Sequence, residues 1–237
     1  MIPKTIYQTW KTQNLPKKVV NLHQKMLKMN SEYEHIIYTN DQMNDYMVSN
    51  ADKEIRELYF KLNNIVARAD IWRYTVLLNK GGIYIDIDSE ICKPLSELIK
   101  TNDRAIITAE KNKNLFVQWA LIFEKNHPIL ELTLKNILTA VSNGFYRNDH
   151  HSLTVKTYAN AVFEYAKTSN DKLNWESITH KTDKTFICSE NSFRLYGIDY
   201  NEFFKFKHKY NHLLRNRKKG QSSSDHWTEE QHVNNLY

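Results

Sequence analysis

The sequence is poor in glycine, proline and cysteine. Its 237 residues include 5 glycines, 4 prolines and 2 cysteines. Cys92 and Cys188 lie far apart with no spacing motif, which excludes a disulfide-rich scaffold and indicates a reducing compartment, with a single disulfide left open. No apolar run approaches the roughly 20 residues of a membrane span, and the start MIPKTIYQTW lacks the profile of a signal peptide. We therefore expect a cytoplasmic protein.

The basic charge is concentrated near the C-terminus. The formal net charge is +6, and residues 205–219 hold seven of the 33 Lys and Arg residues and no acid. The remaining 26 basic residues are nearly balanced by the 27 acids of the whole chain. A local basic run is suited to phosphates, anionic lipid or nucleic acid, and a solvated basic helix or loop explains it equally well.

Strands and helices alternate along the first half of the chain. Hydrophobic content of 41% and charged content of 25% are ordinary for one large globular domain. Strand patterns cover residues 4–10 and 33–39, and a long helical pattern over residues 64–79 ends at Gly81-Gly82. This alternation predicts an α/β fold with a mostly parallel central sheet flanked by helices. Such sheets bind ligands beyond the carboxyl ends of their strands.

The stretch GGIYIDID, residues 81–88, combines a glycine pair with a strand that ends in two carboxylates. Successive strand side chains point to opposite faces, so the isoleucines share a core face and Tyr84, Asp86 and Asp88 share the other. Like charges this close repel one another unless a cation lies near them. The acidic face is therefore either exposed to solvent or in contact with a cation.

Three chemistries fit an acid–x–acid motif at a strand end. A calcium loop counted from Asp86 fails, because Ile91 stands where glycine is needed. A haloacid-dehalogenase-type phosphatase would use Asp86 as nucleophile, but Glu90 replaces the usual Thr or Val of that pattern. A divalent Mg²⁺ or Mn²⁺ held against a nucleoside diphosphate fits best, because these ions take carboxylates together with phosphates. Two surface aspartates on an edge strand remain the simplest alternative.

The helical segment ARADIWRY before the glycines adds a second charged pair. Asp70 and Arg73 are three residues apart and share one helical face. A surface ion pair would contribute only a few tenths of a kcal/mol. Because the surrounding residues are apolar nearly all round, the pattern instead predicts a buried helix with a buried charged pair. Such a pair is suited to binding sugar hydroxyls and stabilising oxyanions.

Together these segments resemble glycosyltransferase family 32. ARADIWRYTVLLNKGGIYIDIDSE is similar to the DXD signature of the yeast initiating mannosyltransferases and of bacterial capsule and lipopolysaccharide enzymes, and the large clostridial glucosylating toxins are more distant relatives. IPKTIYQTW resembles the family's IPKxIHQxW strand, with Tyr7 where histidine is common, and SEYEHIIYTND resembles its second strand. The resemblance covers most of residues 2–95 in the family's order.

The resemblance implies a GT-A fold and transfer of a sugar from a nucleotide donor with retention of configuration. By motif position Trp10 would stack on the base, Asp70 and Arg73 would hold the donor sugar, and Tyr84 would lie by the diphosphate or sugar. Asp86 would contact ribose and metal.

Metal ligation is the role that the resemblance gives to the second aspartate and to a C-terminal residue. Asp88 would bind Mn²⁺ or Mg²⁺ directly. In Ser224-Asp225-His226-Trp227, which stands where the family supplies a C-terminal contact, His226 is the expected metal ligand and Asp225 the reserve.

The remaining residues match the family less well. HHSLTVKTYANAV stands where the family often has a TGP-like segment, and His150 and His151 would line the acceptor site or be simply exposed. We expect a single catalytic domain over 1–237, with a nucleotide-sugar half at 1–110 and an acceptor-side half at 111–204. Residues 205–237 would form a basic segment that closes on the site or contacts a membrane.

The sequence therefore predicts a metal-dependent retaining hexosyltransferase. A UDP-sugar is the expected donor and GDP-mannose the second candidate, with a glycan or lipid-linked saccharide as acceptor and no nucleic-acid partner. A phosphatase using Asp86 and a non-catalytic module binding anionic ligands through residues 205–219 are the competing hypotheses.

Overall fold

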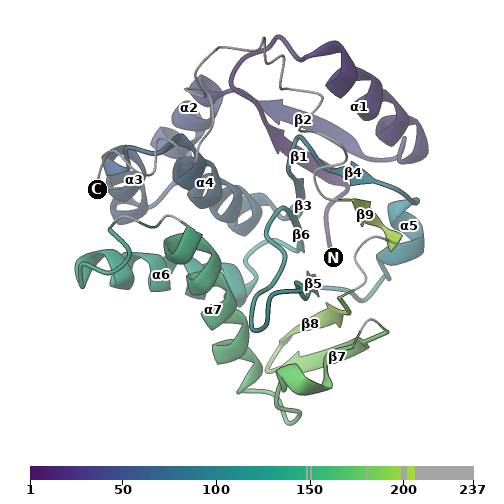
Figure 1. Ribbon diagram of the computed structural model, residues 1–237, viewed down its shortest axis with the longest axis vertical. Coiled ribbons are helices and arrows are strands. Elements are labelled where there is room, and N and C mark those ends of the chain that lie inside the picture. The colour runs from purple at the N-terminus through teal and green to yellow at the C-terminus, as the bar shows by residue number, and fades with distance from the viewer. Residues whose placement is uncertain (148, 150, 180, 199–201, 206–237) are drawn as a thin grey trace, which may run out of the picture.

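The computed structural model describes residues 1–147, 149, 151–179, 181–198 and 202–205 (Figure 1). The elements occur in this order: β1 (Thr5–Thr9), α1 (Lys17–Met29), β2 (Glu34–Tyr38), α2 (Asn40–Asn50), α3 (Lys53–Lys61), α4 (Ile65–Lys80), β3 (Gly82–Ile85), β4 (Glu90–Ile91), α5 (Leu95–Leu98), β5 (Ala105–Thr108), β6 (Ala120–Phe123), α6 (Pro128–Ser142), the π-helix η1 (Ser152–Lys156), α7 (Thr157–Ala166), the 3₁₀-helix η2 (Trp175–Ser177), β7 (Asp183–Cys188), β8 (Asn191–Tyr196) and β9 (Phe204–Lys205).

Within these ranges, seven strands form one sheet in the order β2-β1-β3-β6-β5-β8-β7. β1 pairs in parallel with β2 and β3, and β5 with β8, whereas β6 is antiparallel to both neighbours and β7 to β8. The predicted α/β architecture is confirmed, but the sheet is mixed rather than mostly parallel. The reason is that β5 and β6, and likewise β7 and β8, are joined without a crossover helix, and such connections reverse the strand direction.

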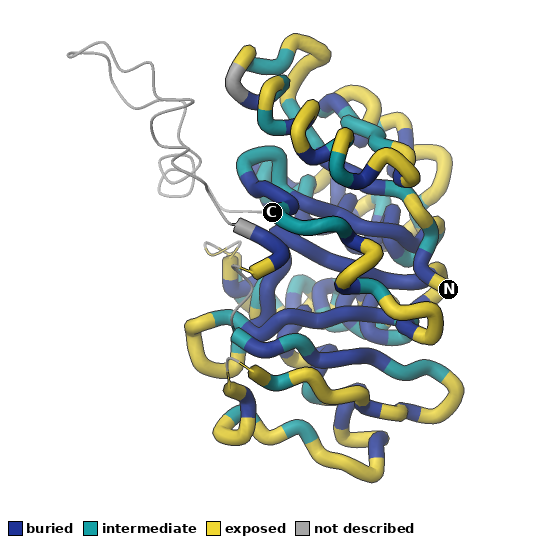
Figure 2. The backbone as a smooth tube through the Cα atoms, turned by 90° about the vertical axis from the view of Figure 1, so that its right-hand side faces the viewer, coloured by how far each residue is buried: buried dark blue, intermediate teal, exposed yellow. Residues whose placement is uncertain are grey.

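Helices cover both faces of the sheet. In Figure 1, α4, α6 and α7 lie on one side and α1 and α5 on the other. Each side has its own hydrophobic cluster, and successive strand residues alternate between them: Ile6 belongs to the α1 side and Tyr7 to the α4 side. Figure 2 shows the central strands as a continuous buried layer.

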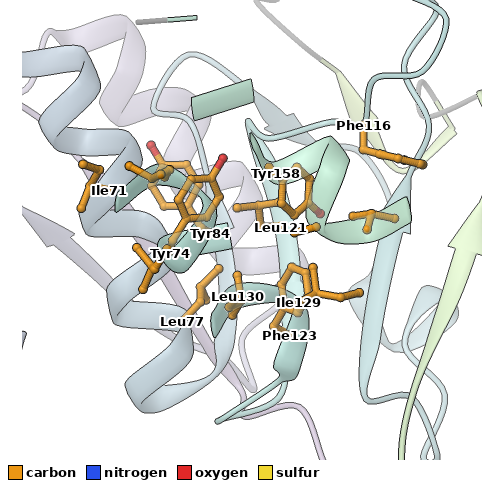
Figure 3. Close-up of a cluster of buried hydrophobic side chains, with 14 of the residues drawn as sticks. Ile71, Tyr74, Leu77, Tyr84, Phe116, Leu121, Phe123, Ile129, Leu130 and Tyr158 are labelled. Carbon is orange, nitrogen blue, oxygen red and sulfur yellow. The ribbon is translucent and has the colours of Figure 1, made fainter. Parts of the chain in front are cut away.

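Both faces of β3 are therefore core, which corrects the expectation of one apolar and one acidic face. Ile83 and Ile85 pack in the α1-side cluster, and Tyr84 is buried in the α4-side cluster. Figure 3 shows Tyr84 beside Tyr74 and Tyr158, between α4 and the sheet. The strand ends at Ile85, so the two aspartates lie just beyond it in a turn.

The glycine pair does what the sequence predicts. Gly81 caps α4 with φ of 66°, and Gly82 enters β3 with φ of 110°. Both values lie in the region that favours glycine. A Cβ on Gly81 would lie 2.6 Å from the Lys125 nitrogen, and one on Gly82 would lie 2.7 Å from the Thr5 carbonyl oxygen. The tight passage from α4 to β3 therefore requires glycine at both positions.

Several features escaped sequence analysis. The sequence predicted neither β8 nor the two-stranded β4–β9 sheet. β4 and β9 have only two residues each, which is too few to show a strand period. The open question of a disulfide is settled, because Cys92 and Cys188 are not disulfide-bonded. None of the helices in the described ranges combines the length and apolar character that a bilayer crossing needs.

Candidate active site

The candidate site lies where β1, β2 and β3 end at the same edge of the sheet. These strands are mutually parallel, so Trp10, Tyr38 and Asp86 come to one edge. Asn64 is the N-cap of α4, and its side chain accepts hydrogen bonds from the backbone nitrogens of Val66 and Ala67. This helix brings Asp70 and Arg73 toward the same edge, because its apolar surface packs against the sheet.

Asp70 and Arg73 form a buried ion pair. Each residue is 6% exposed, and Arg73 Nη2 lies 2.6 Å from Asp70 Oδ1. The surface-pair interpretation is thereby excluded and the predicted buried helix confirmed. Arg73 Nη1 also donates a hydrogen bond to the Gln118 carbonyl at 3.0 Å. The guanidinium is therefore fixed from two sides before any ligand binds.

Arg73 is a cation of the protein itself that contacts Asp86, just beyond the end of β3. Its Nη2 lies 3.4 Å from Asp86 Oδ1, and its guanidinium carbon lies 4.4 Å from the centre of the Tyr84 ring. Burial alone would lower the pKa of Arg73, but Asp70, Tyr84 and Asp86 outweigh it and raise that pKa. The site therefore keeps a permanent positive charge at its base.

Tyr84 connects the aromatic core to the first aspartate. Its hydroxyl donates a hydrogen bond to Asp86 Oδ1 at 2.8 Å. Burial raises the pKa of Tyr84 well above its usual value, so the hydroxyl keeps its proton and remains a donor. One oxygen of Asp86 thus has two positively polarised neighbours, Tyr84 and Arg73.

Thr154 is a site residue that sequence analysis missed. Its hydroxyl donates a hydrogen bond to Asp70 Oδ2 at 2.6 Å, across 84 residues of sequence. Thr154 lies in the π-helix η1, within the segment HHSLTVKTYANAV that stands in place of the TGP-like segment. π-helical turns are frequent at functional sites, but the residue types of this segment do not predict one.

The turn after β3 holds the two candidate metal ligands. The backbone nitrogen of Asp86 donates to the Trp119 carbonyl at 2.8 Å, and that of Ser89 donates to the Asp86 carbonyl at 2.9 Å. Asp86 and Asp88 are both half-buried. Their oxygen donors fit Mg²⁺ or Mn²⁺, which bind through one or two carboxylates and substrate phosphates. No cluster of three or more His, Cys, Asp or Glu suited to a metal occurs within the described ranges.

Trp10 is half-buried at the end of β1 rather than part of the core. It belongs to neither hydrophobic cluster, and its indole nitrogen donates to the Asn14 carbonyl at 3.3 Å. Its predicted stacking on a base stays a prediction.

Other predicted residues lie apart from this cluster or outside the described residues. His151 is exposed, next to η1. His150, Asp225, His226 and all of the basic run except Lys205 lie outside the described residues. The C-terminal metal ligand and the membrane contact therefore stay predictions.

Comparison with known proteins identifies the segment that carries this site. Residues 16–105 match the family model described as the glycosyltransferase sugar-binding region containing a DXD motif. This is a DXD-type glycosyltransferase segment. The match includes Asp70, Arg73, Tyr84, Asp86 and Asp88, and it confirms the resemblance seen in the sequence.

Relatives in this group are named glycosyltransferases. An uncharacterized glycosyltransferase of Acanthamoeba polyphaga mimivirus is 28% identical over 70% of this chain and 67% of its own length. Inositol phosphoceramide mannosyltransferase 3 of Schizosaccharomyces pombe is 29% identical over 57% of this chain and 37% of its own length. The initiation-specific alpha-1,6-mannosyltransferase of Candida albicans is 25% identical, over 57% of this chain and 42% of its own length. The chain thus spans less than half the length of either fungal relative.

A solved structure supports the same fold. The PaToxG glycosyltransferase superposes with a TM-score of 0.57 at 20% identity, covering 69% of each chain. The predicted GT-A type of fold is confirmed.

Proposed function

We propose that this chain transfers a hexosyl unit from a nucleotide sugar to a hydroxyl acceptor with retention of configuration, using Mn²⁺ or Mg²⁺. The observation that carries the proposal is the contact of Arg73 with both Asp70 and Asp86 at the ends of three parallel strands. A fixed cation beside paired carboxylates suits a diphosphate and the sugar attached to it.

The residues divide the work by position. Asp70 has its oxygens occupied by Arg73 and Thr154, and a carboxylate retains further lone pairs for sugar hydroxyls. Arg73 would stabilise negative charge on the departing diphosphate, and Tyr84 orients Asp86 through its hydrogen bond. Asp86 and Asp88 would hold the divalent ion, which neutralises charge on the diphosphate when bound.

The donor is proposed from two sources. A UDP-sugar is the donor that the sequence resemblance favours. Two relatives are named mannosyltransferases, which supports a mannose donor such as GDP-mannose. The acceptor is proposed to be a glycan or a lipid-linked saccharide, because one relative is named for transfer to inositol phosphoceramide.

Thermal unfolding with UDP- and GDP-sugars, each with and without MnCl₂, tests the proposal. We expect a shift of the melting temperature that requires both the metal and one nucleotide, since a ligand that binds only the folded state stabilises it. EDTA should abolish the shift and the transfer or hydrolysis of the donor. Undiminished transfer by a well-folded Asp88→Asn protein would contradict the metal site. Release of inorganic phosphate, together with a phospho-aspartate at Asp86 that fluoride analogues trap, would favour the phosphatase hypothesis.

A further inference from the structure

A buried polar network lies on the opposite side of β1 from Arg73, beneath the turn that holds the two aspartates. Gln8 is fully buried on the α1 side of the sheet, where the neighbouring strand residue on that face is Ile6. A buried amide is costly unless both its donor and its acceptor are satisfied. Gln8 satisfies both, and one of its partners is the turn itself.

The network has three members from three elements. His35 of β2 lies with its Nε2 2.6 Å from Gln8 Oε1, and Gln8 Nε2 donates to the backbone carbonyl of Asp86 at 3.4 Å. His23 of α1 packs edge-on against His35, with ring centres 5.2 Å apart, and its ring bonds to the backbone of Ile87. Gln8 thus holds the Asp86 carbonyl, and His23 holds the backbone of the next turn residue, Ile87.

The hydrogen-bond directions are mutually consistent. Because Gln8 Nε2 donates to Asp86, its Oε1 accepts from His35, which requires a proton on His35 Nε2. Burial lowers the pKa of His35 to about 4, and burial together with His35 lowers the pKa of His23 to about 4. Both rings are therefore neutral near pH 7.

A second link from α1 holds the other end of the turn. Lys25 Nζ lies 2.8 Å from Glu90 Oε1, and Glu90 is buried in β4 directly after the turn. We propose that Gln8, His35 and His23 are positioning residues that fix the backbone of the Asp86–Asp88 turn and thereby set the direction of both carboxylates. This inference rests on the proposed function for its catalytic meaning but not for its structural content.

The decisive variant is Gln8→Met, which keeps the length of the side chain and removes both hydrogen bonds. Thr133→Val is the matched control, because Thr133 is also fully buried and its hydroxyl bonds to the Ile129 carbonyl in α6. We expect hydrogen exchange of the Asp86 and Ser89 amides to accelerate in Gln8→Met, and to stay as in the parent protein in Thr133→Val. Unchanged exchange at these amides in folded Gln8→Met would overturn the proposal.

A second pair of variants keeps the test decisive if Gln8→Met does not fold. His35→Gln replaces the imidazole N–H donor toward Gln8 with an amide N–H donor, whereas His35→Met has no donor at this position. We expect His35→Met to loosen the turn and His35→Gln to restore it. Equal exchange of the turn amides in these two variants would overturn the proposal as well.

The functional consequence is measured by Mn²⁺ binding in the presence of UDP or GDP, using the paramagnetic resonance of free Mn²⁺. Loss of a hydrogen-bond partner behind a metal ligand typically weakens metal binding by about 10- to 100-fold, and we expect this range for Gln8→Met. If the parent protein binds no Mn²⁺ with either nucleotide, the proposed function fails, whereas the exchange experiment still decides the positioning role. Mn²⁺ affinity equal to that of Thr133→Val would overturn the link between the network and the carboxylates.

Discussion

Two arginines of this fold are buried beside aspartates, and their surroundings differ. Arg194 of β8 forms a two-pronged pair with Asp103, with Nε at 3.0 Å and Nη2 at 2.8 Å, and it also bonds to Asp183 and to the Leu98 carbonyl. Arg73 bonds to Asp70 and Gln118, and its Nε has no partner among the described residues.

We propose that this difference separates a structural pair, Arg194 with Asp103, from a functional one, Arg73 with Asp70. The Arg194 contacts are distributed over all three guanidinium nitrogens and tie β8 to the segment before β5. Arg73 instead contacts two carboxylates, Asp70 and Asp86, and an aromatic ring lies beneath it. Asp86 lies just beyond the carboxyl end of a parallel strand, which is where such sheets bind ligands. Four predictions test this contrast.

The largest effect is expected for Arg73→Lys. Lysine keeps the charge but loses the planar donor arrangement, so the departing diphosphate loses its fixed partner. Removal of one preorganised donor of this kind typically lowers kcat by about 10²- to 10³-fold, and we expect this range in assays of donor hydrolysis or transfer. Arg68→Lys is the control, because Arg68 lies on the same helix and donates hydrogen bonds to the backbone carbonyls of Leu62 and Phe60. Equal activity of the two variants would remove Arg73 from the site.

Arg194→Met should instead affect stability. It leaves Asp103 buried without its partner, and breaking a buried pair in this way typically costs about 3–5 kcal/mol in the free energy of unfolding. Denaturant unfolding measures this loss, and the activity per folded molecule should not change. The double variant Arg194→Met with Asp103→Leu should recover much of the stability. A fall in kcat of folded Arg194→Met would end the distinction between the two pairs.

Tyr84→Phe sharpens the contrast within the site. The variant keeps the ring beneath Arg73 but removes the hydrogen bond to Asp86, and a bond to a charged group contributes about 1.5–3 kcal/mol. We expect kcat/KM to fall about tenfold or more, with a small change in melting temperature. Tyr158→Phe is the control, because the buried Tyr158 hydroxyl has no partner within the described part of the chain. A similar loss of activity in both variants would contradict the role of the Tyr84 hydroxyl.

The smallest effect is expected for Asp183, the second aspartate that contacts Arg194. Burial alone would raise the pKa of Asp183, but Arg194 and Lys100 outweigh burial and lower this pKa below its usual 3.8. A carboxylate with a lowered pKa in the folded state stabilises the protein above its unfolded pKa, and this contribution is lost as the pH falls through the folded value. Asp183→Asn should therefore melt slightly below the parent protein at pH 6 and together with it at the acid end. A gap between the two melting curves that widens as the pH falls would reverse the sign of this interaction.

The first half of the fold and its site could be predicted from sequence because local signals agree there. The apolar spacing of the segment before Gly81 predicted the buried α4, and the Asp70–Arg73 spacing placed both charges on one face. Thr154 could not be predicted, because its contact with Asp70 depends on how a distant π-helical segment packs. The β5–β6 hairpin was missed for a similar reason, since strand direction is set by pairing and not by the apolar pattern.

Buried polar residues were the other limit of sequence analysis. Gln8 and His35 look like ordinary strand residues, and only their arrangement in three dimensions makes them partners of the Asp86 backbone. The predicted division at residue 110 also stays a prediction. Strands from both sides of that residue belong to the main sheet: β1, β2, β3 and β5 precede it, and β6, β7 and β8 follow it.

The π-helix η1 has a consequence for insertions and deletions. It continues directly into α7, which buries Tyr158, Val162 and Tyr165 on its own apolar face. An α-helix advances about 100° for each residue, so removing one residue between Thr154 and Thr157 would rotate Thr154 away from Asp70 if α7 kept its packing. The π-helical turn therefore sets the rotation of Thr154 relative to the buried face of α7. A chain-length change here would remove the Thr154 hydrogen bond from Asp70 without changing any residue of the DXD motif.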